Sequence, residues 1–475
     1  VRRELDADLA GSPRMRIYAT RESELWARRV FVDVRLGDRR NDMRLIAVAA
    51  GLCDRPGGKV SAVFRRTKDR EAAYDFLENE HVSPEAIVEG MAEATAKKAK
   101  EFPFVYVPVD GTSLSLTNRA KTKDFGRIGT HTAGASGLKV LDALAVDPQG
   151  VTLGWLDLRF WNRPTEPGPP MTTYEKQARS PDDKETRYWL QTIEAVAARL
   201  DAQGARGWFQ IDSEGDARDW LLKLHQTGHD WTVRNRKDRN AIFENGDVGR
   251  LRAQLATCPP QGHYEFEAQK TEKRSARTAW MAIRVGRVDL PLRDQKTGRI
   301  TKMPVHVVWA REEGTTPEGE EPLDWLLLTN REVTTLEQAR AVVHGYALRW
   351  RVEECHKTWK SDGCNIEETQ LQSTHAVQIW AVLAAAVAAR IERLKLLSRT
   401  QPELPASVEF TPIEVRALVL LKRRNKKRAE VIGDNPTIRE AVLWVAELCG
   451  YTGKSSGGPP GALTIRRGLE ALNQA

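Results

Sequence analysis

The chain has 475 residues, of which 41% are hydrophobic and 29% are charged, so it can bury a sizeable core in two or three domains. Its five scattered cysteines include no Cys-x-x-Cys pair, and no stretch approaches the ~18 apolar residues of a membrane span, which argues against disulfide-framework, zinc-site and membrane proteins. The net charge of +8 favours a polyanionic partner, and we expect a soluble, cytoplasmic protein without a membrane partner.

The first hundred residues are expected to be helical and basic. A periodic segment from Arg39 to Leu52 predicts a helix with Asp38 as its N-cap. Arg39, Arg40 and Arg65 are available for contacts with phosphates. Charged faces on small helices are common, however, so these side chains could equally be ordinary solvated surface.

Two short apolar stretches each end at an aspartate. Residues 104–109 predict a buried strand that closes on Asp110, and residues 208–211 predict another that closes on Asp212. Between them, residues 138–146 and 151–158 predict strands, and residues 185–200 predict a helix. Because ligands gather at the carboxyl ends of strands in open α/β sheets, we expect the two aspartates to share one crevice. Alternatively, each is a turn residue or a helix N-cap.

The segment that follows offers residues with two interpretations each. Asp216 lies one turn past Asp212 and either supports it or starts the next helix. Arg234 directly follows a strand-like stretch and could belong to a solvated basic turn. From about 255 to 330, several β-like stretches predict a β-rich insertion, in which Trp325 could simply be core because three leucines follow it.

The stretch from Tyr346 to Lys360 is the most informative part of the sequence. On an α-helix, steps of three, four and seven would put Tyr346, Arg349, Glu353 and Lys360 within roughly 60° of one another. This face suits a metal ion and the phosphates it holds, because cations bind phosphate oxygens while a carboxylate binds the metal. The alternative is an ordinary helix with spaced salt bridges. Glu354 points about 100° away and is expected to pair with a nearby cation.

Two strand-end aspartates followed far downstream by a helical glutamate resemble the DDE set of RNase H-like transposases and integrases. Residues Tyr346, Arg349, Glu353 and Lys360 match the Tyr-Arg-Glu-Lys signature of the bacterial insertion-sequence-four family, the group that contains the transposon-five transposase. Segments 109–115, 212–216 and 322–329 are similar to further motifs of this family in the same order. The likeness covers residues 26 to 360 and is weaker beyond them.

The resemblance implies an α/β fold, with an RNase H-like mixed sheet flanked by helices, a β-rich insertion, and helical N-terminal and C-terminal domains. It implies that Asp110, Asp212 and Glu353 are catalytic and hold two Mg²⁺ ions, for which Mn²⁺ can substitute, because these ions prefer oxygen ligands. Asp216 would stand behind these ligands. The residues implied to contact DNA are Tyr346, Arg349, Lys360, Trp325, Arg234, His356, Lys357, Arg39, Arg40 and Arg65.

The expected domains follow from the same resemblance. Residues 1–90 would bind transposon-end DNA, and residues 91–370 would form the catalytic domain, with the insertion at about 255–330. Residues 371–475 would form a helical domain for DNA contact and dimerisation, beginning with a long helix at 376–397. The basic stretch 422–428 could bind nucleic acid or be a solvated linker.

The implied activity is cut-and-paste transposition. A homodimer in a synaptic complex would cleave double-stranded DNA at inverted transposon ends and join the 3′-hydroxyl ends to target DNA, on the bacterial nucleoid. Whether a hairpin forms on the excised end stays open. Two alternatives also stay open: a metal-dependent nuclease without strand transfer, and a non-catalytic DNA-binding regulator derived from a transposase.

Overall fold

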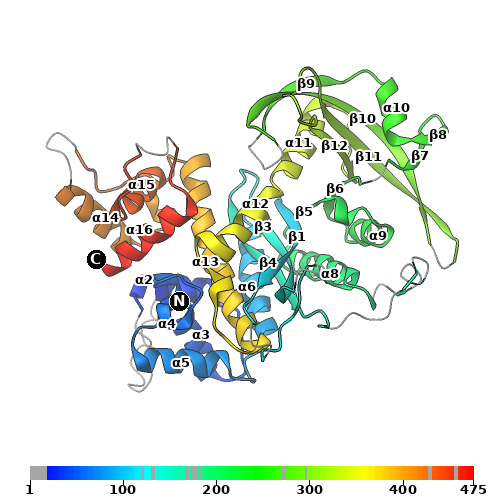
Figure 1. Cartoon of the computed structure of the whole chain (residues 1–475). Helices are drawn as coiled ribbons and strands as arrows, with labels where there is room; N and C mark the ends of the chain where they lie inside the picture. Colours follow the sequence, from blue (N-terminus) through cyan, green and yellow to red (C-terminus); the bar gives the residue numbers. More distant parts are fainter. Residues whose placement is uncertain are drawn as a thin grey trace.

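The computed structural model describes residues 19–118, 122–129, 134–165, 171–172, 175, 179–180, 183–236, 238–268, 274–294, 297–425, 431–453 and 458–475. In this part of the chain a 12-stranded mixed sheet runs through the molecule, with helices on both faces and further helices at both chain ends (Figure 1). The predicted fold class is therefore confirmed: a mixed α/β sheet flanked by helices, with helical N-terminal and C-terminal regions.

The RNase H-like core occupies one end of the sheet, in the strand order β4-β3-β1-β5-β6. β1 pairs antiparallel with β3 and parallel with β5, which pairs parallel with β6. Val105, Val107 and Val109 pack towards α8 and α9, whereas Tyr106 packs towards α11 (Leu336–Ala347), because successive side chains of a strand point to opposite faces. The bounds are β1 Val105–Ser115, β2 Gly126–Arg127, β3 Ser136–Val146, β4 Thr152–Trp161, α8 Thr186–Gln203, β5 Gly207–Ile211, η4 Ser213–Gly215, α9 Arg218–Gln226 and β6 Asp230–Arg234.

The β-rich part continues the same sheet. β12 pairs antiparallel with β6, and β11 and β10 follow beyond it, with β7 and β9 both paired to β10. Its strands begin at Asn240, earlier than the expected 255, because β7 and β8 are too short to leave an alternating pattern in the sequence. The bounds are β7 Asn240–Phe243, β8 Val248–Arg250, α10 Leu251–Thr257, β9 Gly262–Ala268, β10 Arg277–Arg293, β11 Ile300–Glu312 and β12 Asp324–Thr329.

The N-terminal helices pack beside the RNase H-like core and against α13 (Thr374–Thr400) (Figure 1). The predicted helix after Asp38 is confirmed, and the Asp38 carboxylate accepts a hydrogen bond from the Arg40 amide at 2.8 Å. This cap satisfies one of the amides that have no partner within the helix. The bounds are α2 Arg21–Val30, α3 Arg39–Asp54, α4 Val60–Val63, α5 Thr67–Leu77 and α6 Pro84–Ala99.

The long helix α13 lies at the centre of a hydrophobic core that it shares with the N-terminal and C-terminal helices. It spans Thr374–Thr400, and it is the helix in the described residues whose length and composition would suit a membrane span. However, 78% of its most apolar window is buried inside the protein. The indole groups of Trp155 and Trp359 donate to its carbonyls at Ala385 and Ala381. The remaining bounds are α11 Leu336–Ala347, α12 Trp350–Lys357, η5 Thr358–Asp362, η6 Ile366–Glu368, η7 Ala406–Val408, α14 Pro412–Asn425, α15 Ile438–Leu448 and α16 Ala462–Gln474.

Candidate active site

The parallel pairing of β1 with β5 brings Asp110 and Asp212 to the same level of the sheet. Val109 pairs with Ile211 as the last parallel partners, and each aspartate is the next residue of its chain. The prediction that Asp110 ends its strand is wrong, because β1 continues antiparallel to β3 as far as Ser115. The two aspartates are neighbours because the parallel ladder stops at this point, although strand β1 does not end there.

Asp212 is also an N-cap, which was the alternative role considered from the sequence. It caps the short 3₁₀ turn η4, and its carboxylate accepts a hydrogen bond from the Glu214 amide at 2.7 Å. The cap leaves Asp212 partly exposed at the end of β5. A cap and a metal ligand are compatible roles, since a carboxylate has two oxygens and several lone pairs.

The stretch from Tyr346 to Lys360 is not the single α-helix that the sequence predicted. α11 ends at Ala347, α12 begins at Trp350, and Lys360 lies in the π-helical turn η5. Between the helices the backbone tightens, and the Arg349 amide donates to the Tyr346 carbonyl three residues back. This tight turn is followed by the wide π-helical turn η5, and Arg349 and Lys360 still both face strand β1. The Arg349 guanidinium lies 3.5 Å from Asp110, and Lys360 Nζ donates to Thr112 Oγ1 at 2.6 Å.

The helix termination also changes which side chains are buried. Val352 and Trp359 are fully buried, whereas Trp350 is 48% exposed at the start of α12. A capping box of Thr335 and Gln338 starts α11. Glu354 pairs with Arg351 at 2.8 Å and lies 3.6 Å from Lys395, which agrees with its expected role outside the ligand set.

Arg349 connects two of the predicted catalytic acids. Its guanidinium lies 2.7 Å from Glu353 and 3.5 Å from Asp110, and its side chain is only 9% exposed. Burial by itself lowers the pKa of Arg349, but Asp110, Tyr346 and Glu353 raise it above its ordinary value. The Nε atom is buried and has no hydrogen-bond partner. A permanently charged group thus lies in the space that Asp110 and Glu353 share.

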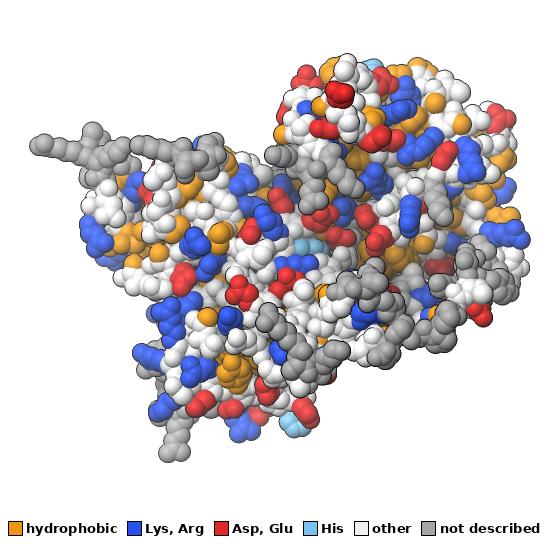
Figure 2. Space-filling model, viewed as in Figure 1, with side chains coloured by type: hydrophobic (Ala, Val, Ile, Leu, Met, Phe, Trp, Pro, Cys, Tyr) orange, Lys and Arg blue, Asp and Glu red, His pale blue; other side chains and the backbone are white. Residues whose placement is uncertain are grey.

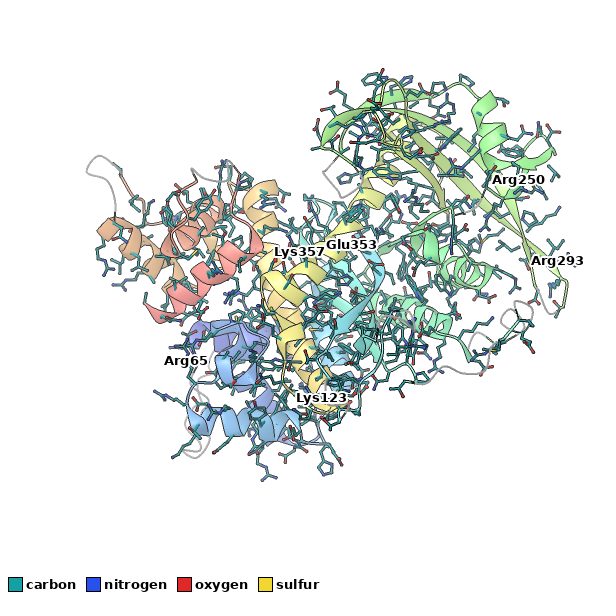
Figure 3. All side chains as sticks on the ribbon, viewed as in Figure 1. Arg65, Lys123, Arg250, Arg293, Glu353 and Lys357 are labelled. Carbon is teal, nitrogen blue, oxygen red and sulfur yellow. The ribbon has the colours of Figure 1, made fainter. Side chains whose placement is uncertain are left out.

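Asp110 is held in surroundings that disfavour its charge. Burial raises its pKa from the ordinary 3.8 to about 6, although the cations Arg349 and His356 act in the opposite direction. The neighbouring acids Asp142 and Glu353 raise it further. In the space-filling view, acidic side chains gather in the hollow between the β-rich part and the C-terminal helices (Figure 2). Figure 3 places Glu353 near the centre of the molecule, on α12.

The three acids fit a divalent metal ion by donor type. Asp110, Asp212 and Glu353 offer the hard carboxylate oxygens that Mg²⁺ prefers, and a cation among them would offset the burial that raises the pKa of Asp110. Among the described residues, no three Asp, Glu, His or Cys side chains are already arranged as a metal site. Two of the acids instead contact Arg349, and Asp212 contacts the backbone, so their side chains would turn on binding.

Three residues predicted to contact DNA form a cluster beside the acids. Tyr346 is 4% exposed and Trp325 is 8% exposed, and their rings meet edge to face at 5.7 Å. The ring of Phe266 also meets that of Trp325 edge to face, with the ring centroids 5.0 Å apart. Burial raises the pKa of the Tyr346 phenol, while the nearby cations Arg349 and Arg234 lower it. In this structure Trp325 is thus part of the core, as the sequence also allowed.

His356, which the resemblance implies contacts DNA, is largely buried in this structure. His356 is 7% exposed, and its Nε2 lies 2.7 Å from the carboxylate of Asp142 on β3. Burial lowers the pKa of His356, but Asp142 outweighs it and raises that pKa. Sequence reasoning missed Asp142, although one signal was present: it is an acid in the stretch 140–146, which is otherwise apolar.

Asp216 connects the turn that follows Asp212 to the loop after β6. Its side chain is 1% exposed and is paired with Arg239, and it accepts hydrogen bonds from the Arg236 amide and from Asn235. It therefore supports the segment that carries Asp212. Its position is compatible with the supporting role that the sequence suggested.

The other predicted DNA contacts lie at the surface. Lys357 is close to Glu353 in Figure 3, and its side chain is 71% exposed and pairs with Asp362 at 2.9 Å. Arg40 pairs with Asp38 at 2.8 Å, and Arg39 and Arg65 are exposed on the N-terminal helices. In the basic stretch 422–428, residues 426–428 lie outside the described residues.

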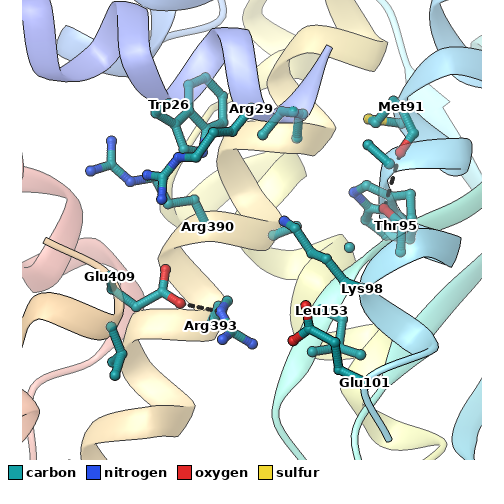
Figure 4. Close-up of a pocket in the computed structure, with 17 residues that line it drawn as sticks. Trp26, Arg29, Met91, Thr95, Lys98, Glu101, Leu153, Arg390, Arg393 and Glu409 are labelled. Atoms are coloured by element: carbon teal, nitrogen blue, oxygen red, sulfur yellow. Dashed lines mark hydrogen bonds and ion pairs between the residues drawn. The ribbon is translucent and has the colours of Figure 1, made fainter. Parts of the chain in front are cut away.

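A cavity of about 240 Å³ lies apart from this site, between α2, α6, β4 and α13 (Figure 4). Its apolar floor includes Trp26 and Leu153, and its charged rim consists of Arg29, Lys98, Glu101, Arg390, Arg393 and Glu409. Arg393 pairs with Glu409. No predicted site residue lines this cavity.

Three family models match the chain. Residues 23–82 match a transposase DNA-binding model, residues 178–389 a transposase DDE domain, and residues 386–474 a transposase Tn5 dimerisation domain. The DDE match contains Asp212 and Glu353, while Asp110 lies upstream of it. DNA and a second copy of the chain are therefore its partners, and DDE transposases use divalent metal ions. From its DNA-binding, catalytic and dimerisation segments, the chain belongs to the DDE transposases and is similar to the transposase of Tn5.

Proposed function

We propose that this protein is a cut-and-paste transposase whose active site consists of Asp110, Asp212 and Glu353. It binds the inverted ends of a transposon, cleaves them by metal-dependent hydrolysis, and joins the 3′-hydroxyl ends to target DNA as a synaptic homodimer on the bacterial nucleoid. The observation that carries the proposal is the convergence of the acids. Asp110 and Asp212 directly follow Val109 and Ile211, which are parallel partners on β1 and β5. Arg349 contacts both Asp110 and Glu353.

The chain's own groups divide the chemistry between them. Two Mg²⁺ ions, or Mn²⁺ in their place, would activate the attacking oxygen and stabilise the pentacoordinate phosphate and the leaving oxygen. Asp110, Asp212 and Glu353 would hold the ions through carboxylate oxygens. Arg349 and Lys360 would bind phosphate oxygens, since both are cations beside Asp110 on β1. Arg234 and Tyr346 would orient DNA from the neighbouring cluster, and Asp216 would keep Asp212 in place.

The test begins with the three acids. The substrate is a DNA fragment that carries the short inverted repeats flanking the gene, with Mg²⁺ and the full chain. We expect Asp110→Ala, Asp212→Ala and Glu353→Ala each to abolish cleavage while end binding, measured by gel shift, stays near that of the parent. The matched control is Glu354→Ala, because Glu354 adjoins Glu353 but pairs with Arg351 and Lys395. Nicking near the parental rate in any of the three variants would refute the assignment.

A second measurement separates the transposase from its two alternatives. Pre-cleaved ends with free 3′-hydroxyl groups are incubated with a supercoiled plasmid and the full chain. Joined products identify a transposase, whereas cleavage without joining identifies a nuclease. Binding without either reaction identifies a regulator. Protection of the excised end against a 5′ exonuclease, with snap-back on denaturation, reports whether a hairpin forms.

A further inference from the structure

An acid that no part of the proposed active site uses lies directly beside Asp110. Asp142 on β3 is the register partner of Asp110 on β1, so both side chains leave the same face of the sheet, towards α12. Asp142 is 0% exposed. Burying a carboxylate at this depth is costly unless another group compensates its charge, and burial raises the pKa of Asp142.

The compensating group comes from the helix that carries Glu353. His356 is three residues after Glu353, and its Nε2 lies 2.7 Å from Asp142 Oδ2. The imidazole stacks parallel on the indole of Trp155, at 6.5 Å and 10° between the planes. Trp155 is itself fixed, because its Nε1 donates to the Ala385 carbonyl of α13 at 2.8 Å. The position and the plane of the imidazole are thus both determined.

The contact between Asp142 and His356 connects the strand that bears Asp110 with the helix that bears Glu353. Asp142 is the cross-strand partner of Asp110, and His356 lies on α12, about one turn after Glu353. The second oxygen of Asp142, Oδ1, is buried and has no hydrogen-bond partner. Hydrogen bonding of its own polar atoms therefore does not explain why Asp142 is buried at this position. A metal site needs its ligands held within fractions of an ångström, and groups behind the ligands usually provide this.

We propose that Asp142 and His356 are positioning residues that set the distance between Asp110 and Glu353 and so determine the affinity of the site for its divalent ions. The inference rests on the proposed function, because it takes Asp110 and Glu353 as metal ligands. It replaces the expected DNA contact of His356 by an internal one. Neither residue touches the reacting atoms.

The experiment measures Mn²⁺ binding to the full chain by isothermal titration calorimetry, together with the Mg²⁺ concentration that gives half-maximal end cleavage. For Asp142→Asn, which preserves the shape of the side chain but removes its charge, we expect about 10- to 100-fold weaker Mn²⁺ binding. The half-maximal Mg²⁺ concentration should rise by a similar factor, while end binding stays unchanged. Unchanged Mn²⁺ affinity would overturn the proposal.

A matched control separates positioning from general stability. Asp157 on β4 is also a buried acid, at 2% exposure, and its partner Arg159 lies 2.7 Å away, outside the proposed site. Asp157→Asn should lower the melting temperature without changing Mn²⁺ affinity. If both variants lose Mn²⁺ affinity equally, the effect of Asp142 is merely structural and the proposal fails.

The histidine provides a second, independent variant. Glutamine can place its amide nitrogen near the position of the imidazole Nε2, so His356→Gln should retain most of the Mn²⁺ affinity while His356→Ala loses it. Equal losses in both variants would contradict a role through the contact with Asp142. Asp110→Ala is measured alongside: if it retains Mn²⁺ binding and cleavage, the proposed function itself fails, and if only the Asp142 and His356 variants resemble the parent, this inference alone fails.

Discussion

Replacing Asp110 by asparagine should abolish cleavage and, without metal, make the protein more stable. A carboxyl group whose pKa is raised from 3.8 to about 6 on folding costs roughly 3 kcal/mol when it is ionised in the folded protein. Asparagine has nearly the same shape and no charge. It leaves Arg349 with Glu353 as its remaining close acid, which offsets part of the gain. We therefore expect the free energy of unfolding to rise by about 1–3 kcal/mol at pH 7.5.

The pH dependence distinguishes this cause from others. Because the pKa of Asp110 is higher in the folded chain, the parent loses stability as the pH rises from about 4 to about 6. The advantage of Asp110→Asn should therefore be absent below pH 4 and complete above pH 6. The assay is urea unfolding in EDTA, followed by tryptophan fluorescence across this pH range. A variant that is no more stable than the parent at pH 7.5, or an advantage that does not depend on pH, would refute the reasoning.

The acid Asp216 serves as the contrasting control. It is buried like Asp110 but is paired with Arg239 and accepts two further hydrogen bonds. Asp216→Asn removes the charge from a satisfied group, so the free energy of unfolding should fall at pH 7.5. Opposite signs for the two substitutions are the expected result.

Three further predictions concern the helix packing and the DNA contacts. Gly345→Ala should destabilise the protein by about 1–3 kcal/mol and slow cleavage, because a Cβ there would lie 2.6 Å from the Tyr106 ring and displace α11; a parental melting temperature would contradict this. Arg65→Ala should weaken end binding and reduce the salt dependence of binding by about one counterion. Arg40→Ala should weaken end binding less, because Arg40 pairs with Asp38. Equal effects of the two substitutions in filter-binding assays would count against this distinction. Lys360→Met should lower the cleavage rate but leave end binding intact. A variant that cleaves at the parental rate would exclude Lys360 from the site.

Local patterns were sufficient for the elements of the core. The apolar stretches before Asp110 and Asp212, the cap at Asp38 and the capping box at Thr335 depend on neighbours within a few residues, and the structure contains all of them. The continuation of β1 past Asp110 could not be predicted, because residues 111–115 are polar or small apart from Leu114, and they pair with β3. A partner that is distant in sequence decided that strand end.

The residue types in the chain determined by themselves which chemistry is available: three acids, an arginine and a lysine at spacings that match a transposase. Only the tertiary structure decided how they are arranged. It placed Arg349 between two acids, interrupted the helix of Glu353, and buried His356 against Asp142 instead of exposing it to DNA. The physical reason is that ion pairing and burial depend on distances across strands and helices far apart in the chain, which residue spacing along one element does not contain.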